Sequence, residues 1–208
     1  MQELLPAGCG AALCAALAIP VRAVCGLLQK RRGLAQDMEQ KHLWILLAGL
    51  ALFGGVIGWR AGFSLRGLYL ILVLFTSACV FYIDARHRVI PNELVLAILA
   101  LAAVFGLTGA IPFQIGSSLL GLAACFVIFF LPGLLGKRVG AGDIKLASAM
   151  GFALGLTGSL YAIAAMGALV LLYVLIDRRA PLPQQLKEMI PMGPFLALAL
   201  VGMSIALV

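Results

Sequence analysis

The chain has 208 residues, of which 63% are hydrophobic and only 11% are charged. Soluble domains are about 45–50% apolar and about 25% charged, so this composition excludes a sizeable aqueous domain. The apolar runs are continuous and do not alternate with polar residues, which predicts an all-α, polytopic helical membrane protein. The net charge of +7 is typical of basic cytoplasmic loops, so we expect membrane lipid and no nucleic acid as a partner.

Seven apolar runs have the length of a transmembrane helix, which is roughly 20 residues with about 17–25 acceptable. In chain order they are residues 4–28, 43–59, 67–83, 94–110, 115–135, 159–176 and 192–208. An eighth run, 144–156, has 13 residues and is predicted to be either a tilted, partly sunken helix or a re-entrant one. The first run lacks a basic segment ahead of it, so we interpret it as a spanning segment and not as a signal peptide.

Basic residues indicate the orientation of these runs, because they gather in cytoplasmic loops. With loop 29–42 in the cytoplasm and run 144–156 counted as a full crossing, four loops share that side. These loops are 29–42, 84–93, 136–145 and 177–190, and they hold 12 of the 15 basic residues. The sequence therefore favours eight crossings with both termini outside.

The connections are short, which predicts a single integral-membrane domain over residues 1–208. The five cysteines lie inside apolar runs and have no C-x-x-C spacing. We expect them to be small packing residues, with neither a disulfide framework nor a metal site.

Two aspartates, Asp84 and Asp143, stand where an apolar run meets a basic loop, both on the side predicted to be cytoplasmic. A carboxylate beside hydrocarbon is costly and is typically kept for function, so two of them at one membrane depth indicate acid–base chemistry. Each also has a structural interpretation. Asp143 can cap a helix that begins at Ile144, and Asp84 can be a solvated residue among basic neighbours.

The segment Ile90-Pro91-Asn92-Glu93 follows Asp84 and predicts a turn into the next helix. Pro91 stops the incoming chain from continuing as a helix, Asn92 can cap the new helix, and Glu93 suits its first turn. His87 is interpreted as an exposed loop histidine, although histidine is also a common catalytic base.

Two further segments, residues 140–145 and 190–194, contain glycine or proline near a predicted helix start. Gly140 and Gly142 impose no side chain on the backbone before Asp143, which permits close approach of another part of the chain. Lys145 is expected to point toward lipid headgroups. The stretch Ile190-Pro-Met-Gly-Pro194 predicts either a simple helix start or an open backbone surface where an extended peptide could pair.

Together these motifs resemble those of the type IV prepilin peptidases, aspartic proteases of the GxGD membrane class. The matching segments are Asp84 with Ile90-Pro91-Asn92, then Gly140-Ala141-Gly142-Asp143-Ile144-Lys145, and finally Ile190-Pro191-Met192-Gly193-Pro194-Phe195. The resemblance covers the chain from about residue 43 to its end. Larger members carry two C-x-x-C pairs in an insert after the first span, linked to zinc and N-methylation, whereas loop 29–42 contains no cysteine.

The resemblance implies an endopeptidase of the bacterial inner membrane that removes the short basic leader from prepilins or pilin-like precursors. It would cut after a glycine on the cytoplasmic side, without a metal or other cofactor, and we expect no N-methyltransferase activity. Asp84 and Asp143 would be the catalytic pair, one acting as base and one as acid, in either order. The supporting residues would be Pro91, Asn92, Gly140, Gly142, Lys145, Pro191, Gly193 and Pro194.

Three other interpretations use the same residues. A proton- or ion-coupled transporter could use the aspartates as a relay, but such proteins typically have mid-bilayer carboxylates and repeated halves. A non-catalytic protein of pilus or secretion assembly would not need both aspartates. A protease of the signal-peptide-peptidase type would carry Pro-Ala-Leu where this chain has Pro191-Met192-Gly193. The sequence leaves open which precursor is cleaved and whether the protein forms oligomers.

Overall fold

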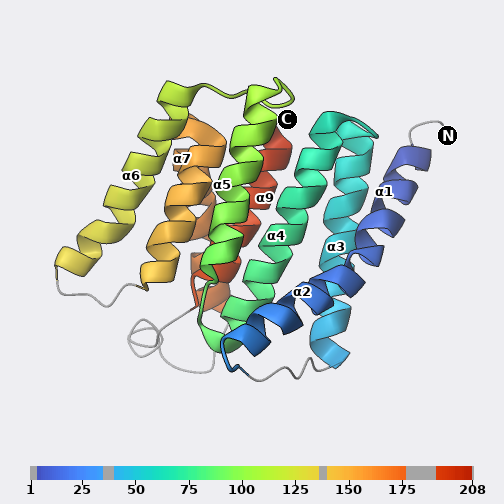
Figure 1. The fold of residues 1–208 in the computed structure, drawn as a ribbon, viewed down its shortest axis with the longest axis horizontal. Helices are drawn as coiled ribbons and strands as arrows, with labels where there is room; N and C mark the ends of the chain where they lie inside the picture. The colour runs from blue at the N-terminus through green and yellow to red at the C-terminus, as the bar shows by residue number, and fades with distance from the viewer. Residues whose placement is uncertain (1–3, 35–39, 136–139, 177–190, 208) are drawn as a thin grey trace.

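The computed structural model describes residues 4–34, 40–135, 140–176 and 191–207, and the regular structure in these ranges is entirely α-helical. The predicted all-α class is therefore confirmed. The helices are α1 (Leu4–Ala16), α2 (Ala18–Arg31), α3 (Gln40–Ala61), α4 (Leu65–His87), α5 (Asn92–Leu107), α6 (Ile115–Leu134), α7 (Ala141–Ile176) and α9 (Gly193–Leu207). They form a bundle with α6 at one edge and α1 at the other (Figure 1).

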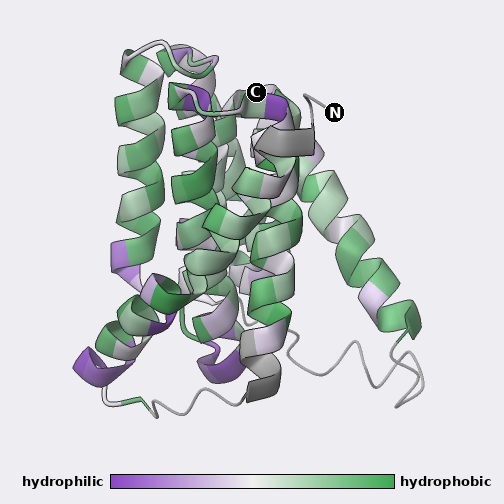
Figure 2. Cartoon of the chain, turned by 90° about the vertical axis from the view of Figure 1, so that its right-hand side faces the viewer, coloured by the Kyte–Doolittle hydropathy of each residue, from purple (hydrophilic) through white to green (hydrophobic). Residues whose placement is uncertain are grey.

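Five helical segments are long and apolar enough to cross a membrane, so a multi-pass membrane protein is confirmed. These segments are Ala7–Arg31, Trp44–Ala61, Leu65–His87, Ile115–Leu134 and Ala141–Ile176, while α5 and α9 are shorter apolar helices. Hydrophilic residues gather toward the ends of the helices and hydrophobic residues fill the lengths between them (Figure 2). The count of eight crossings stays a prediction.

The first apolar run remains one candidate span, Ala7–Arg31, but it bends. α1 and α2 meet at Leu17. Pro20 has no N–H group to bond back to the carbonyl of Ala16, which explains a break at this point. α1 packs closely along α3, where a Cβ atom at Gly10 would lie only 2.5 Å from the carbonyl oxygen of Gly54. α2 turns away and crosses the lower end of α4 (Figure 1).

Helix α7 folds back on itself at Gly155, where φ is 69° and ψ is 179°. Side-chain-bearing residues rarely adopt this backbone conformation, so glycine permits the reversal. The turn lies beside the beginning of α6, where the N–H of Leu156 donates to Ser117 Oγ at 3.1 Å. The ring of Tyr173, near the end of α7, packs edge-on against Phe195 at the start of α9. Run 144–156 therefore reaches the far end of the bundle before the chain returns.

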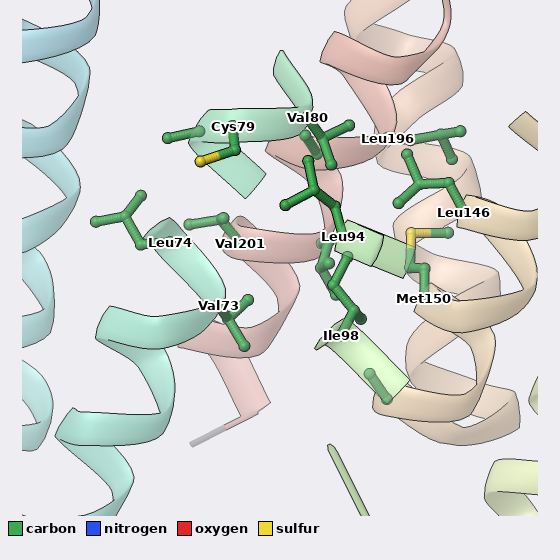
Figure 3. Close-up of a cluster of buried hydrophobic side chains, with 14 of the residues drawn as sticks. Val73, Leu74, Cys79, Val80, Leu94, Ile98, Leu146, Met150, Leu196 and Val201 are labelled. Atoms are coloured by element: carbon green, nitrogen blue, oxygen red, sulfur yellow. The ribbon is translucent and has the colours of Figure 1, made fainter. Parts of the chain in front are cut away.

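α4 is the central helix of the bundle. Its candidate span is 67% buried, whereas the other four spans are 17–28% buried. Its inner side packs with α5, α7 and α9 around residues such as Val80, Leu94, Leu146 and Leu196 (Figure 3). Large apolar side chains on the outside, such as Trp44 at 69% exposure, suit contact with lipid.

Candidate active site

Asp84 lies in the last turn of α4 and its side chain is buried, with 4% of the residue exposed. The helix ends at Arg88, which adopts the left-handed conformation with φ 54° and donates its N–H to the Asp84 carbonyl at 2.8 Å. This geometry contradicts the interpretation of Asp84 as a solvated loop residue. Because α4 is the central helix, its carboxylate is enclosed by the helices packed around it.

The Asp84 carboxylate accepts a hydrogen bond from the last of the three motifs. The backbone N–H of Gly193 donates to Asp84 Oδ2 at 3.0 Å. Gly193 is the first residue of α9, so this N–H is one of the groups that a helix leaves without an internal partner. A Cβ atom at residue 193 would lie 2.6 Å from Asp84 Oδ2, so glycine is needed for this approach. The positive end of α9 therefore faces the carboxylate.

Asp143 is the third residue of α7 and lies in its first turn, so the prediction that it caps the helix is wrong. The carbonyl of Gly140 accepts the N–H groups of Asp143 and Ile144 at 3.0 and 3.3 Å, which makes Gly140 the residue that begins the helix. Glycine is tolerated at such a position. The Asp143 carboxyl group lies back over Gly140, because a Cβ atom there would be 2.8 Å from Asp143 Oδ2.

The structure brings the two aspartate motifs together, although they are 59 positions apart in the sequence. Ile90, in the segment after α4, packs onto Gly142, where an added Cβ atom would lie 3.0 Å from Ile90 Cβ. The carboxyl groups of Asp84 and Asp143 interact electrostatically. Together with the Gly193 contact, this places all three sequence motifs at one end of the bundle.

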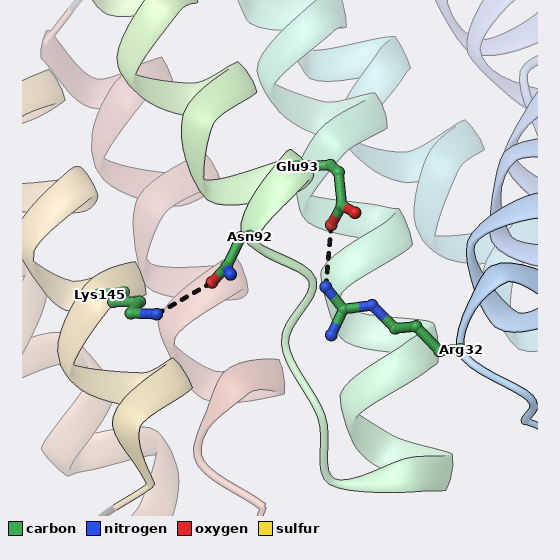
Figure 4. A network of polar contacts seen from close by, with 4 residues as sticks. All are labelled: Arg32, Asn92, Glu93 and Lys145. Atoms are coloured by element: carbon green, nitrogen blue, oxygen red, sulfur yellow. Dashed lines mark hydrogen bonds and ion pairs between the residues drawn. The ribbon is translucent and has the colours of Figure 1, made fainter.

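A hydrogen bond joins the start of α5 to the start of α7, with Lys145 Nζ donating to Asn92 Oδ1 at 3.1 Å (Figure 4). Lys145 is exposed, and its position beside lipid headgroups stays a prediction. Asn92 does not cap α5. Pro91 occupies the cap position, and the Asn92 side chain turns toward Lys145 instead. The hydrogen bond between these two residues joins the beginnings of α5 and α7.

Helix α2 contributes two contacts that the sequence did not indicate. Arg32 forms an ion pair with Glu93 at 3.0 Å (Figure 4), and the side-chain amide of Gln29 donates to His87 Nε2 at 3.1 Å. His87 is thus the half-buried last residue of α4 and not an exposed loop residue. Gln29 and Arg32 lie in a polar stretch, and no motif or residue spacing in the sequence predicts that they contact His87 and Glu93.

The proline-rich segment behaves as a helix start. α9 begins at Gly193 and Pro194 is buried in its first turn, as one of the two interpretations predicted. Pro191 is half-buried in the chain entering the helix, whereas residue 190 lies outside the described part of the chain. Among the described residues, no group of three or more His, Cys, Asp or Glu side chains could hold a metal ion. The catalytic roles of the site residues stay predictions.

Comparisons with known proteins agree with the motifs. A family model described as the type IV leader peptidase family matches residues 68–175. A prepilin leader peptidase/N-methyltransferase of Pseudomonas putida is 30% identical over 159 residues, covering 73% of this chain and 54% of that protein. A protein of the same name from Stutzerimonas stutzeri is 29% identical over 193 residues, covering 87% and 64%.

The matched relatives are longer than this chain, which covers about half to two thirds of their length. The protein of that name from Xanthomonas campestris is 31% identical over 154 residues, which cover 68% of this chain and 50% of that protein. No solved structure matches the chain.

Proposed function

The chain belongs to the type IV leader peptidase family, and from this membership we propose that it is an aspartic endopeptidase acting on prepilins or pilin-like precursors. It removes the short basic leader by cutting after a glycine at the boundary of the cytoplasmic membrane. The observation that carries the proposal is the convergence of Asp84, Asp143 and Gly193 at one end of the bundle.

The two aspartates supply the acid and the base of the reaction. Carboxyl groups held close together do not both ionise cheaply, so the pair shares one proton. The ionised member takes a proton from water as the water oxygen attacks the peptide carbonyl. The protonated member donates to the developing oxyanion, and the tetrahedral intermediate then collapses as the amine leaves with a proton. Either aspartate fits either role.

The surrounding residues hold this pair in place. The Gly193 N–H positions the Asp84 carboxylate, and the Lys145–Asn92 hydrogen bond fixes the start of α7 beside α5. Pro91, Pro191 and Pro194 set the entries of the neighbouring helices. The glycines Gly140 and Gly142 leave room for Asp143 and for Ile90.

We place the site on the cytoplasmic face of a bacterial inner membrane, since the basic residues gather at that end. A precursor would then keep its basic leader in the cytoplasm and its apolar helix in the bilayer. The helices would act as one peptidase domain. The relatives are named for a second activity, N-methylation. We propose peptidase activity alone, because loop 29–42 lacks the cysteine pairs associated with the insert of larger members.

The proposal is tested with a precursor that carries a basic leader, a glycine and an apolar helix. Wild-type protein in membranes is expected to cleave it, with N-terminal sequencing placing the cut after the glycine. Asp84→Asn and Asp143→Asn should each abolish cleavage. Glu93→Gln is a matched control, because it makes the same change at an exposed carboxylate on the same end of the bundle. Full cleavage by both Asn variants would contradict the catalytic role proposed for Asp84 and Asp143.

A further inference from the structure

An apolar groove of about 210 Å³ lies between α3, α4 and α9. Its lining includes Leu46, Gly49, Leu74, Ser77, Phe81 and Val201. Leu74 of α4 and Val201 of α9 lie near each other on this wall (Figure 3). Ile45 at the rim is 59% exposed, so the groove opens on the outer surface of the bundle, where the protein meets lipid.

The groove begins next to the candidate active site. Phe81, in its lining, is three residues before Asp84 on α4, and Ala197 is four residues after Gly193 on α9. Three to four residues are one helical turn. From there the lining continues along α4 to Leu74, about 10 Å farther from the carboxylate pair at 1.5 Å per residue. The groove therefore leads from the reacting centre toward the middle of the membrane.

One polar side chain in the groove lacks a partner. Ser77 is 3% exposed, and its hydroxyl has no hydrogen-bond partner among the described residues. Its neighbour Thr76 shows the usual solution in a buried helix, donating to the carbonyl of Leu72 at 2.8 Å. The Ser77 oxygen is itself covered by the surrounding helices, so the surface that the groove offers to an occupant is apolar.

We propose that the groove binds the apolar helix of the precursor, the segment that follows the scissile bond; this rests on the proposed function. The groove is too small for a whole helix but accommodates a ridge of its side chains. A lipid acyl chain could also fill the apolar space. Continuity with the carboxylate pair favours the substrate, because the lining begins one helical turn from Asp84 and Gly193.

Gly49→Leu tests the proposal by filling the groove. Gly49 lines it, and a Cβ atom there would meet nothing within 4 Å, so the new side chain enters open space. Gly167→Leu is the matched control, because Gly167 is exposed on α7, outside the groove lining, and equally open. Ser77→Ala removes the hydroxyl without adding volume.

Two substrates distinguish an effect on binding in the groove from an effect on the reaction itself. One is the complete precursor, and the other is a peptide that ends a few residues after the scissile glycine and lacks the apolar helix. Gly49→Leu is expected to raise KM for the precursor roughly tenfold or more, since a hydrophobic pocket discriminates single methylenes by at least that factor. Its cleavage of the peptide should match wild type. Ser77→Ala removes only a covered hydroxyl, so it should leave KM unchanged for both substrates, as should Gly167→Leu.

Binding is also measured without cleavage. A photo-crosslinking residue replaces Leu198, which lines the groove, in the Asp84→Asn background, and the precursor is added in lipid vesicles. An adduct with the apolar helix of the precursor is expected. Lipid adducts alone, or precursor kinetics of Gly49→Leu equal to those of Gly167→Leu, would overturn the groove assignment and leave the peptidase proposal intact. Failure of wild-type protein to cleave either substrate would instead refute the peptidase proposal, and the groove assignment with it.

Discussion

The candidate site depends on close approach between a carboxylate and a backbone amide. Asp84 is buried at the end of the central helix. The N–H of Gly193 has no partner within α9 and donates to Asp84 Oδ2 at 3.0 Å. A hydrogen bond of this kind holds the side chain in one orientation and stabilises its charged form. The site therefore requires the absence of a side chain at residue 193 as much as it requires the carboxylate itself.

Gly193→Ala should displace the Asp84 carboxylate, because the added Cβ atom would lie 2.6 Å from Oδ2. A misplacement of about 1 Å in an active site costs on the order of 100-fold in rate, so we expect kcat for precursor cleavage to fall by about that factor. Gly202→Ala on the same helix is the control, since its Cβ atom meets nothing within 4 Å. Equal kcat values for the two variants would show that the approach is not needed.

Individual site residues differ in how well the sequence predicts them. Asp84 and Asp143 are conspicuous because each is an acidic residue at the end of an apolar run. The Lys145–Asn92 and Gln29–His87 contacts join residues 53 and 58 positions apart. Such pairs depend on how the helices pack, which polar residues in a loop do not reveal. For the same reason, the sequence predicts a cap at Asn92, whereas in the fold its side chain accepts from Lys145.

At the scale of helices, hydropathy predicts most element positions but not the places where backbone hydrogen bonding is interrupted. The expected runs 94–110 and 115–135 correspond closely to α5 and α6. The first run contains Pro20, and it divides into α1 and α2 although Arg22 is its only charged residue. Runs 144–156 and 159–176 are the two arms of α7, and the reversal between them depends on the backbone of one glycine.

Gly155→Ala should therefore destabilise the fold. Residue 155 has φ 69°, which disfavours any side chain, and its Cβ atom would also lie 2.8 Å from Ser117 Oγ. Backbone strain of this type costs about 1–3 kcal/mol. We expect a lower Tm in detergent than for the wild type. Gly167→Ala in the same helix lies in open space and should leave Tm unchanged or raise it slightly. A Gly155→Ala protein as stable as wild type would show that the turn is not strained by a side chain.

At the scale of the whole molecule, the packing gathers three distant motifs at the end of the bundle that carries most of the described basic residues. α5 and α9 pack against both α4 and α7, which brings these motif-bearing helix ends together (Figure 1). The sequence predicted this common face from the distribution of lysine and arginine. It could not predict that the segments carrying the two aspartates meet, because the depth of a residue in the membrane does not fix its position within the bundle.

Thiol labelling in intact cells tests the orientation. In a variant lacking the native cysteines that still cleaves the precursor, Gln114→Cys and Glu93→Cys each introduce one exposed thiol, at the beginning of α6 and of α5 respectively. A membrane-impermeant thiol reagent should label the first in intact cells and the second only after the cells are opened. Labelling of the second in intact cells would place the candidate site on the outer face.

The central claim is that Asp84 and Asp143 act as one catalytic unit. Single-turnover cleavage rates of Asp84→Asn, Asp143→Asn and the double variant test it most directly. Residues that act as a unit are strongly non-additive, and losing one costs about as much as losing all. We predict that each single variant loses roughly 10⁴-fold or more and that the double variant is no slower than either. A single variant that keeps near-wild-type cleavage, or losses that multiply in the double variant, would contradict the account.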